Sequence, residues 1–220
     1  MNNNKRGWWC ALPLAACATS PTWAAEKAAS KEESLVVIGR KDADGVQSYQ
    51  PLTSVTGTRS ETSLLNVPQA IDVVPQQVIT DQAVSSLDEA LYNVSGITQA
   101  NTLGGTQDAV MKRGFGDNRD GSILRDGVRS VQARNFTPTT ERVEVLKGPA
   151  SMLYGMGEPG GMINMITKKP QLQQHTHVEG WGSSFNGGGG QLDVTGPLGT
   201  SGFAYRMIVD HDETDYWRNF

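Results

Sequence analysis

The stretch ERVEVLKGPASMLYGMGEPGGMINMITKKP, residues 141–170, contains a strand, a short helix and a second strand. Apolar and charged residues alternate in ERVEVLKG, which is typical of a strand that buries Val143 and Val145 on one face. In GPASMLYG, Pro149 and Gly155 are residue types that commonly begin and end a helix. GMINMITKKP has the composition of a mostly buried strand. The stretch therefore predicts a small core that combines α and β elements.

Three segments before this stretch extend the same domain. AIDVVP, residues 70–75, is typical of a strand. In SSLDEALYNVSG, Ser86 and Glu89 match a capping box. A helix there would end at Gly96 and would bury Leu87, Ala90, Leu91 and Val94. SILRDGVRSV contains an Asp126–Gly127 pair that favours a two-residue hairpin turn. We expect one α+β domain over residues 59–170.

After Pro170 the pattern changes to alternation over longer segments. HTHVEGWGS places His175, His177, Glu179 and Trp181 on one side. QLDVTG and FAYRMIVDH place apolar residues opposite polar ones in the same way, and SFNGGGG and PLGTSG are expected to join the three segments. Such alternation is typical of transmembrane β-barrel strands, and soluble antiparallel sheets show it as well.

The first residues have the features of a secretory signal peptide. Lys5 and Arg6 precede an apolar stretch, and small residues before Ala25 fit cleavage after Ala24. Leu14 to Cys17 also matches a lipoprotein cleavage site, in which Cys17 would carry lipid. Both interpretations imply export of the chain.

Residues 25–58 are polar, and we expect them to be flexible. Leu35–Ile38 is an apolar exception inside this segment. It predicts either a strand that packs on the following domain or a strand that an outside partner adds to the edge of its own sheet.

Composition excludes several classes of protein. Both cysteines, Cys10 and Cys17, lie in the leader, so cleavage after Ala24 would leave no disulfide and no zinc–thiolate site. The net charge of -4 argues against a nucleic-acid-binding protein. No segment after the leader approaches the roughly 18 apolar residues of a spanning helix. No catalytic constellation is present, and the G-x-G-x-x-G letters of residues 155–160 precede a strand, the reverse of a dinucleotide-binding motif.

Residues 141–170 resemble the end of the plug domain of TonB-dependent outer-membrane receptors, in the ferric-siderophore subgroup. NVPQAIDVVPQQVI, residues 66–79, resembles the opening of that plug. LDEALYNVSGI, KRGF and LRDGVR resemble its first helix, its central strand and its hairpin. The resemblance extends over about residues 31–220.

The resemblance implies an α+β plug domain at residues 59–170, with a small mixed sheet and short helices. It also implies that residues 171–220 are the first antiparallel strands of a transmembrane β-barrel. The family's barrel has 22 strands, and the expected fold is therefore truncated. The sequence would be a fragment or the product of a truncated gene.

The resemblance further implies a receptor and transporter of the bacterial outer membrane rather than an enzyme. Its partners would be a ferric siderophore, outer-membrane lipid and the TonB protein with its ExbB/ExbD complex. The segment at residues 33–39 occupies the place of the TonB box, which would bind TonB through Glu33, Ser34, Leu35, Val36, Val37, Ile38 and Gly39.

The family's plug also suggests contacts for the ligand. By position, the siderophore-binding residues would be Arg113, Gln132, Arg134 and Phe136, and Lys147 would contact the barrel wall. The siderophore fills the coordination sphere of the iron, so the protein needs no metal ligand and no cofactor. Two alternatives stay open: the same kind of receptor for haem, cobalamin or a glycan, and a periplasmic or lipid-anchored binding module.

Overall fold

The computed structural model describes residues 49–116, 121–184, 186–200 and 202–213. The predicted signal peptide of residues 1–24, the alternative lipid site at Cys17 and the predicted TonB box at residues 33–39 lie outside the described residues.

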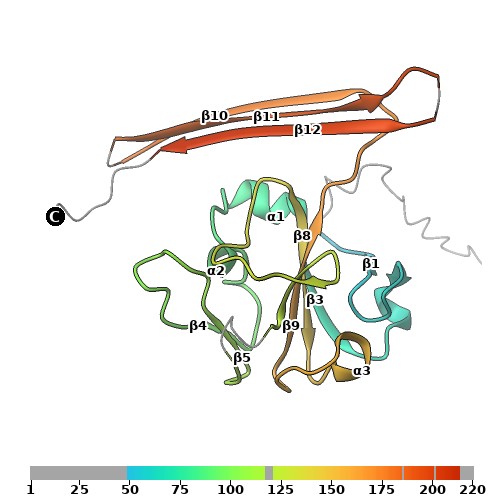
Figure 1. The fold of residues 1–220 in the computed structure, drawn as a ribbon, viewed down its shortest axis with the longest axis vertical. Coiled ribbons are helices and arrows are strands. Elements are labelled where there is room, and N and C mark those ends of the chain that lie inside the picture. Colours follow the sequence, from blue (N-terminus) through green and yellow to red (C-terminus); the bar gives the residue numbers. More distant parts are fainter. Residues whose placement is uncertain (1–48, 117–120, 185, 201, 214–220) are drawn as a thin grey trace, which may run out of the picture. The chain divides into compact units, whose positions relative to one another are not determined.

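Short strands and helices alternate through the first part of the described chain, and longer strands follow (Figure 1). In order, the elements are β1 Thr53–Ser54, β2 Thr62–Ser63, a 3-10 helix Leu64–Asn66, β3 Ala70–Val74, α1 Gln76–Asp81, α2 Leu87–Ala90, β4 Ile97–Gln99, β5 Val110–Lys112, β6 Ile123–Arg125, β7 Val128–Arg129, β8 Thr140–Lys147, α3 Ser151–Tyr154, β9 Gly161–Thr167, β10 His175–Ser183, β11 Gly187–Pro197 and β12 Ala204–Glu213.

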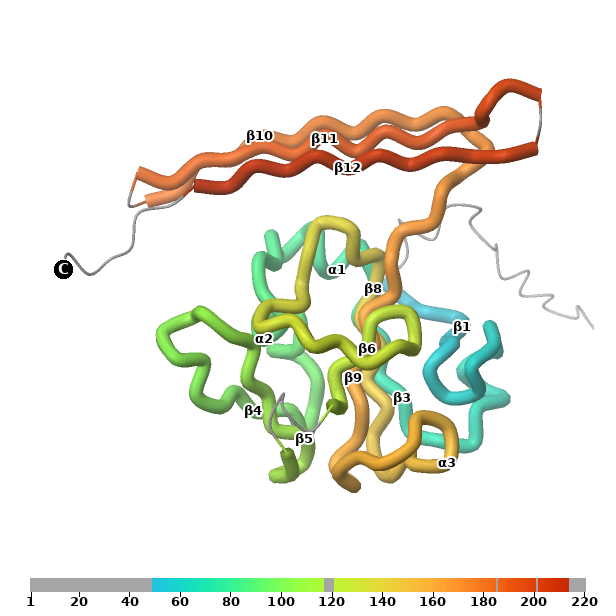
Figure 2. The backbone as a smooth tube through the Cα atoms, viewed as in Figure 1, coloured from blue at the N-terminus to red at the C-terminus, as the bar shows by residue number. Residues whose placement is uncertain are grey.

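A mixed sheet, here called the central sheet, organises the domain. Its strand order among the described residues is β3-β8-β9-β6-β7. β8 pairs antiparallel with β3 and with β9, whereas β6 runs parallel to β9. Figure 2 shows these strands side by side. The predicted α+β domain with a small mixed sheet is confirmed.

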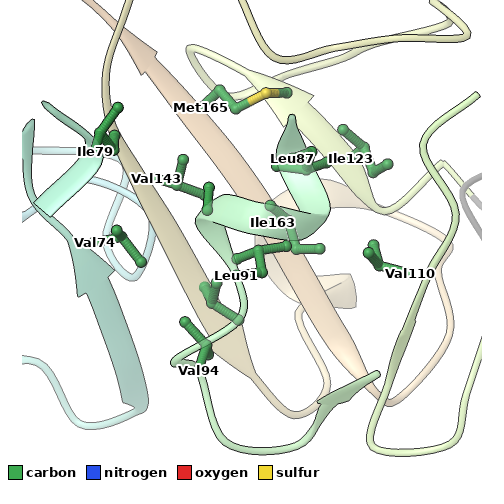
Figure 3. Packing of buried hydrophobic residues seen from close by; sticks show 12 residues of the cluster. Val74, Ile79, Leu87, Leu91, Val94, Val110, Ile123, Val143, Ile163 and Met165 are labelled. Atoms are coloured by element: carbon green, nitrogen blue, oxygen red, sulfur yellow. The ribbon is translucent and has the colours of Figure 1, made fainter. Parts of the chain in front are cut away.

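One face of the central sheet packs on the helices. In Figure 3, Leu87 of α2 and Leu91, the residue that follows the helix, face Val143 of β8 and Ile163 of β9. These side chains are almost completely buried. Burying a leucine or isoleucine side chain contributes about 1.5–3 kcal/mol, so this cluster supplies much of the stability of the domain.

The other face of the central sheet holds a second, smaller cluster. Leu146 of β8 and Met162 of β9 pack there with Leu124 and Ala150. Because side chains alternate along a strand, Glu144 of β8 and Asn164 of β9 lie on this second face as well. The central sheet is therefore buried on both sides.

Helix α2 is shorter than its sequence pattern predicts. The stripe Leu87, Ala90, Leu91 and Val94 is buried as expected, but the α-helix ends at Ala90. The predicted capping box at Ser86 is wrong, because Ser86 makes no side-chain cap. Glu89 instead accepts hydrogen bonds from the backbone N–H and the hydroxyl of Ser85, at 2.8 and 2.9 Å.

The predicted turn at Asp126–Gly127 is confirmed. Asp126 and Gly127 both have positive φ, as a two-residue hairpin turn between β6 and β7 requires. At the first residue of β9, a Cβ atom on Gly161 would lie 2.1 Å from the carbonyl oxygen of Leu146. Only glycine fits there, because the backbone of β8 approaches so closely.

Strands β10–β12 form a separate antiparallel sheet, here called the C-terminal sheet. Its register aligns Val178, Leu192 and Val209 in one row and Val194 with Met207 in the next, so the apolar side chains share a face. The predicted alternation is confirmed.

The glycine run after β10 corrects the expected connection between β10 and β11. SFNGGGG was predicted to be a loop, but Gly187–Gly190 belong to β11. Gly188 and Gly190 pair with Gly182 and Gly180 of β10. Trp181 lies opposite Gly189, and a Cβ atom on Gly189 would be 2.6 Å from its ring. A larger residue there would displace the ring.

In the part of the chain that the structure describes, no helix has the length and apolar character needed to cross a membrane.

The cluster on α2 leads to a prediction about stability. Leu87→Ala should lower the free energy of unfolding by about 2–5 kcal/mol, because it removes a fully buried side chain and leaves a cavity. Leu65, which is 96% exposed, is the matched control, and Leu65→Ala should change it by less than about 0.5 kcal/mol. Urea unfolding of both variants measures the difference, and equal losses would contradict this packing.

Candidate functional site

A buried carboxylate in the middle of the central sheet binds the segment at residues 54–56. Glu144 of β8 is fully buried, and its Oε2 accepts hydrogen bonds from the hydroxyls of Ser54 and Thr56, each at 2.6 Å. The backbone N–H groups of Val55 and Thr56 donate to the same oxygen at 3.0 and 2.9 Å. One acceptor thus holds a segment about 90 residues away in the sequence.

Two further hydrogen bonds hold Thr56. Its hydroxyl accepts a hydrogen bond from Asn164 Nδ2 at 3.0 Å, and its carbonyl accepts one from the hydroxyl of Tyr154 at 2.8 Å. Asn164 Oδ1 accepts a hydrogen bond from the backbone N–H of Gly127 at 3.0 Å. The network therefore joins β9, α3 and the β6–β7 turn to the N-terminal side of the domain.

The charge of Glu144 is compensated inside its own strand. Arg142 Nε donates to Glu144 Oε1 at 2.9 Å, and Arg142 also pairs with Glu141 at 2.9 Å. Burial alone would raise the pKa of Glu144. The hydroxyls of Ser54 and Thr56, the charge of Arg142 and the N–H of Thr56 outweigh it and hold this pKa below its ordinary value of 4.5. Glu144 is therefore ionised at neutral pH.

The sequence reasoning missed this site. Alternation in β8 places Val143 and Val145 inward and Glu144 outward, and the strand proved to be buried on both faces. One signal could have found it: Asn164 interrupts the apolar run of β9, and the register pairs it with Glu144. A polar residue in each of two neighbouring buried strands indicates a polar contact across them.

The same contacts move a predicted boundary. Residues 25–58 were expected to be flexible, but Ser54 and Thr56 are fully buried in the domain. β1 also pairs with β2. The folded part of the chain therefore includes residues 53–58.

Two charged residues bind the loop at residues 130–136, which carries the predicted ligand residues Gln132, Arg134 and Phe136. Asp108 Oδ2 accepts hydrogen bonds from Asn135 N and Nδ2 at 2.6 and 3.1 Å, and the N–H of Asp108 donates to the carbonyl of Ala133 at 2.8 Å. Arg125 donates to the carbonyl of Asn135. These contacts leave Gln132 and Arg134 exposed.

Phe136 has a different environment. It is half-buried and packs against the cluster on the helix face of the central sheet. Its ring therefore anchors the end of this loop to the domain.

Arg113 lies at the far end of β5 from that loop. Its N–H donates to the carbonyl of Gly96 at 2.6 Å, whereas the loop is bonded to Asp108, before β5 begins. Five extended residues between Asp108 and Arg113 span roughly 16 Å. The structure does not bring Arg113 together with Gln132, Arg134 and Phe136.

Arg113 instead shares a turn with Lys147. Lys147 Nζ donates to Ser95 Oγ at 2.7 Å and pairs with Asp72 Oδ2 at 2.5 Å. Ser95 and Gly96 form the turn that Arg113 also contacts. Two basic residues with separate predicted roles therefore meet at one end of the domain.

A second ionic cluster joins the end of β9 to the C-terminal sheet. Arg206 binds Asp193 with two hydrogen bonds, at 2.9 Å from Nε and 2.7 Å from Nη2. Lys168 Nζ lies 3.3 Å from Asp193 Oδ2, and Arg206 Nη1 donates to the carbonyl of Lys169 at 3.0 Å. A bidentate pair of this kind has a defined geometry, so it fixes residues 168–169 to β11 and β12.

The described ranges contain no cluster of side chains that indicates a metal site. They contain no group of three or more His, Cys, Asp or Glu side chains that could hold a metal ion. His177 lies 3.4 Å from Glu179 on β10, and both are about half exposed.

Comparison with known proteins agrees with this architecture. Residues 63–162 match the TonB-dependent receptor plug domain family. The metal-pseudopaline receptor CntO of Pseudomonas aeruginosa strain UCBPP-PA14 is 35% identical over 208 residues, which cover 93% of this chain and 29% of that receptor. The ferripyoverdine receptor of Pseudomonas aeruginosa PAO1 is 34% identical over 165 residues, 70% of this chain and 20% of the receptor.

Solved structures show the same similarity. The pyoverdine outer membrane receptor FpvA from Pseudomonas aeruginosa PAO1, bound to pyoverdine, has a TM-score of 0.69 and 31% identity. The match covers 77% of this chain and 26% of that receptor. The chain thus spans between about a fifth and a third of the length of these relatives.

The ionisation of Glu144 predicts a dependence of stability on pH. Its pKa is lower in the folded chain than in the unfolded chain, so it contributes stability above pH 4.5 that is lost as the pH falls through the lower folded value. Glu144→Gln should remove this part of the pH dependence and cost about 1–3 kcal/mol at pH 7. Urea unfolding between pH 7 and pH 3 measures both effects.

The matched control for this prediction is Glu158→Gln, because Glu158 is an exposed carboxylate. It should keep the wild-type pH profile. A Glu144→Gln variant with the wild-type profile would show that Glu144 is not bonded as described.

Proposed function

Because the chain belongs to the TonB-dependent receptors through the plug domain at residues 63–162, we propose that it serves an outer-membrane receptor that imports a ferric siderophore. The main support is the similarity of almost the whole chain to metal-chelate receptors, 93% of it in the case of CntO. The chain covers 29% of that relative, so the activity of a whole receptor is part of the proposal.

The named relatives bind related kinds of cargo. One is named for metal-pseudopaline and another for ferripyoverdine. Each name describes a metal held by an organic chelator. A ferric siderophore is therefore the cargo that we propose, and another metal chelate is the alternative that the first relative favours.

The plug would present its ligand contacts at the loop that ends at Phe136. Gln132 and Arg134 are exposed there, and Asp108 and Arg125 bind the neighbouring Asn135. An arginine and an amide on a rigid loop suit an anionic chelate with many oxygen acceptors. We place Arg113 and Lys147 together at the other end of β5, where both would meet acidic groups of a barrel wall.

The C-terminal sheet fits the start of such a barrel. One face carries Val178, Leu192 and Val209, and the other carries His177, Asp193 and Gln191. Transmembrane barrel strands have this division between lipid and lumen. We propose that β10–β12 are the first strands of the barrel, with lipid on the apolar face.

Energy would enter through residues 33–39. We propose that TonB, with ExbB/ExbD, adds Glu33 to Gly39 as a strand to its own sheet. Backbone hydrogen bonds give such a contact its affinity, so a proline within the segment would weaken it. Leader cleavage after Ala24 would leave the segment near the start of the exported chain, in the periplasm.

A crosslinking experiment tests the TonB contact. With Cys10 and Cys17 replaced by serine, Val37→Cys should form a disulfide with a cysteine on the edge strand of the periplasmic domain of TonB. Adding Val36→Pro should reduce the yield at least tenfold, because proline removes a backbone donor. Ala28→Pro, outside the segment, should leave the yield unchanged. Equal yields from both proline variants would rule out strand addition.

An uptake experiment tests the cargo. In the organism that carries the gene, its deletion should abolish uptake of radioactive iron from at least one of ferric pyoverdine, a ferric hydroxamate and a ferric catecholate. Deletion of codons 33–39 at the native locus should reproduce that loss. A metal-pseudopaline complex forms the alternative arm. Unchanged uptake of every chelate would refute the proposal.

A further inference from the structure

The N-terminal hairpin, residues 53–63 with strands β1 and β2, is attached to the domain mainly by polar contacts. None of its apolar side chains belongs to the buried core of the described residues, and the fully buried side chains Ser54 and Thr56 are polar. β1 and β2 pair with each other and form a sheet of their own. In the described part of the chain, no ladder joins them to the central sheet.

The polar attachment is concentrated at one acceptor. Both hydroxyls and both N–H groups of residues 54–56 that reach the central sheet converge on the carboxylate of Glu144. Further contacts are Asn164 to Thr56, Tyr154 to Thr56, and Arg59 to α3, where its guanidinium lies 5.4 Å from the ring centre of Tyr154. The buried Gly57 adds one apolar contact, because it lies close to the side chains of Val67 and Ile71. Hydrogen bonds that share one acceptor break together, so the hairpin should leave in one step.

Among the described residues, the hairpin is also the first paired unit that a pull from the N-terminal side would load. Before it, Tyr49 donates a hydrogen bond to the exposed carboxylate of Asp81 on α1. An exposed contact of this kind offers little resistance, because water replaces it readily. The force would then reach Ser54 and Thr56 before it reaches β3, the first strand of the central sheet.

The opposite end of the domain is fixed in a different way. Residues 168–171 are held on the C-terminal sheet by the bidentate pair of Arg206 with Asp193, by Lys168, and by the Gln171 N–H, which donates to Thr195 Oγ1 at 2.9 Å. Between the two ends lies the central sheet with its apolar clusters. Of the hairpin and the central sheet, which would bear the force in series, the hairpin has the weaker attachment.

We propose that Glu144 is a mechanical latch: it holds residues 53–63 on the central sheet, and a pull from the N-terminal side releases this hairpin before the central sheet unfolds. The source of the pull rests on the proposed function, whereas the latch is a property of the chain itself. Release would uncover Glu144 and Asn164 and leave a polar surface on β8 and β9.

Arg142 makes the latch reversible. It lies on β8 with Glu144, and its 2.9 Å contact remains when the hairpin leaves. The carboxylate therefore stays ionised and keeps accepting hydrogen bonds, so Ser54 and Thr56 can bind again once the force ends. A neutral acid would lose part of its acceptor capacity.

Hydrogen exchange of the 220-residue chain, followed residue by residue by NMR, tests whether the hairpin opens separately. The N–H groups of Val55 and Thr56, both bonded to Glu144, should exchange faster than that of Ile163, which donates to the carbonyl of Ser122 in the central sheet. The double variant Ser54→Ala/Thr56→Val should accelerate the first two at least tenfold and leave Ile163 unchanged. Ser54→Ala alone should give a smaller change of the same kind.

Thr53→Val is the matched control, because the Thr53 hydroxyl faces Glu61 within the hairpin, at 3.4 Å, and does not touch Glu144. It should leave the Val55 and Thr56 rates within about twofold of wild type. The latch is refuted if these amides exchange no faster than Ile163 in the wild-type chain, or if the double variant accelerates all three equally.

A pulling experiment tests the order of release without a variant in the latch. Handles at the N-terminus and at Leu172→Cys, in a chain with Cys10 and Cys17 replaced by serine, load the hairpin and the central sheet in series. Leu172 is 64% exposed, so a handle fits there. The first step should extend the chain by up to about 40 Å, the contour length of residues 53–63.

The force of that first step should fall in Glu144→Gln and should keep its wild-type value in Glu158→Gln. A single step that unfolds hairpin and central sheet together would overturn the proposal. Failure of the TonB crosslink with an intact first step would refute the proposed function and leave the latch standing.

Discussion

The fold depends on one constraint: a carboxylate in the middle of the central sheet must keep enough hydrogen-bond donors to stay charged. Glu144 meets this requirement with donors from two sources, Arg142 on its own strand and residues 54–56 from the start of the domain. A buried charge without partners costs several kcal/mol. The N-terminal hairpin is therefore required on this face of the sheet, although it contributes no side chain to the apolar core.

The two faces of the central sheet consequently differ in what holds their covering layers. Leu87 of α2 and Leu91 after it bury apolar surface on one face, an attachment that resists water and does not depend on pH. The hairpin binds the other face through hydroxyls and N–H groups that donate to a carboxylate, and water can replace these hydrogen bonds once the hairpin opens. A single domain thus combines an apolar attachment with a polar one that water can replace.

The residues that we propose as ligand contacts and those that we propose as barrel contacts also lie apart, near opposite ends of β5. Asp108 and Arg125 hold the loop with Gln132 and Arg134 in place, because both bind Asn135 of that loop. Arg113 and Lys147 lie together at the Ser95–Gly96 turn, at the other end of β5. A domain of this size can therefore present a ligand surface and a basic surface to different partners without competition between them.

The sequence by itself determined the elements: the buried stripe of α2, the Asp126–Gly127 turn, the alternation of β8 and the faces of β10–β12 all follow from local periodicity and turn chemistry. The family resemblance also followed from residues 141–170. Only the tertiary structure showed that Glu144 is buried and bonded to Ser54 and Thr56, that Arg113 belongs with Lys147, and that Gly187–Gly190 form part of a strand. Each of these depends on which segments meet across long stretches of chain, and periodicity within a segment carries no information about its partner.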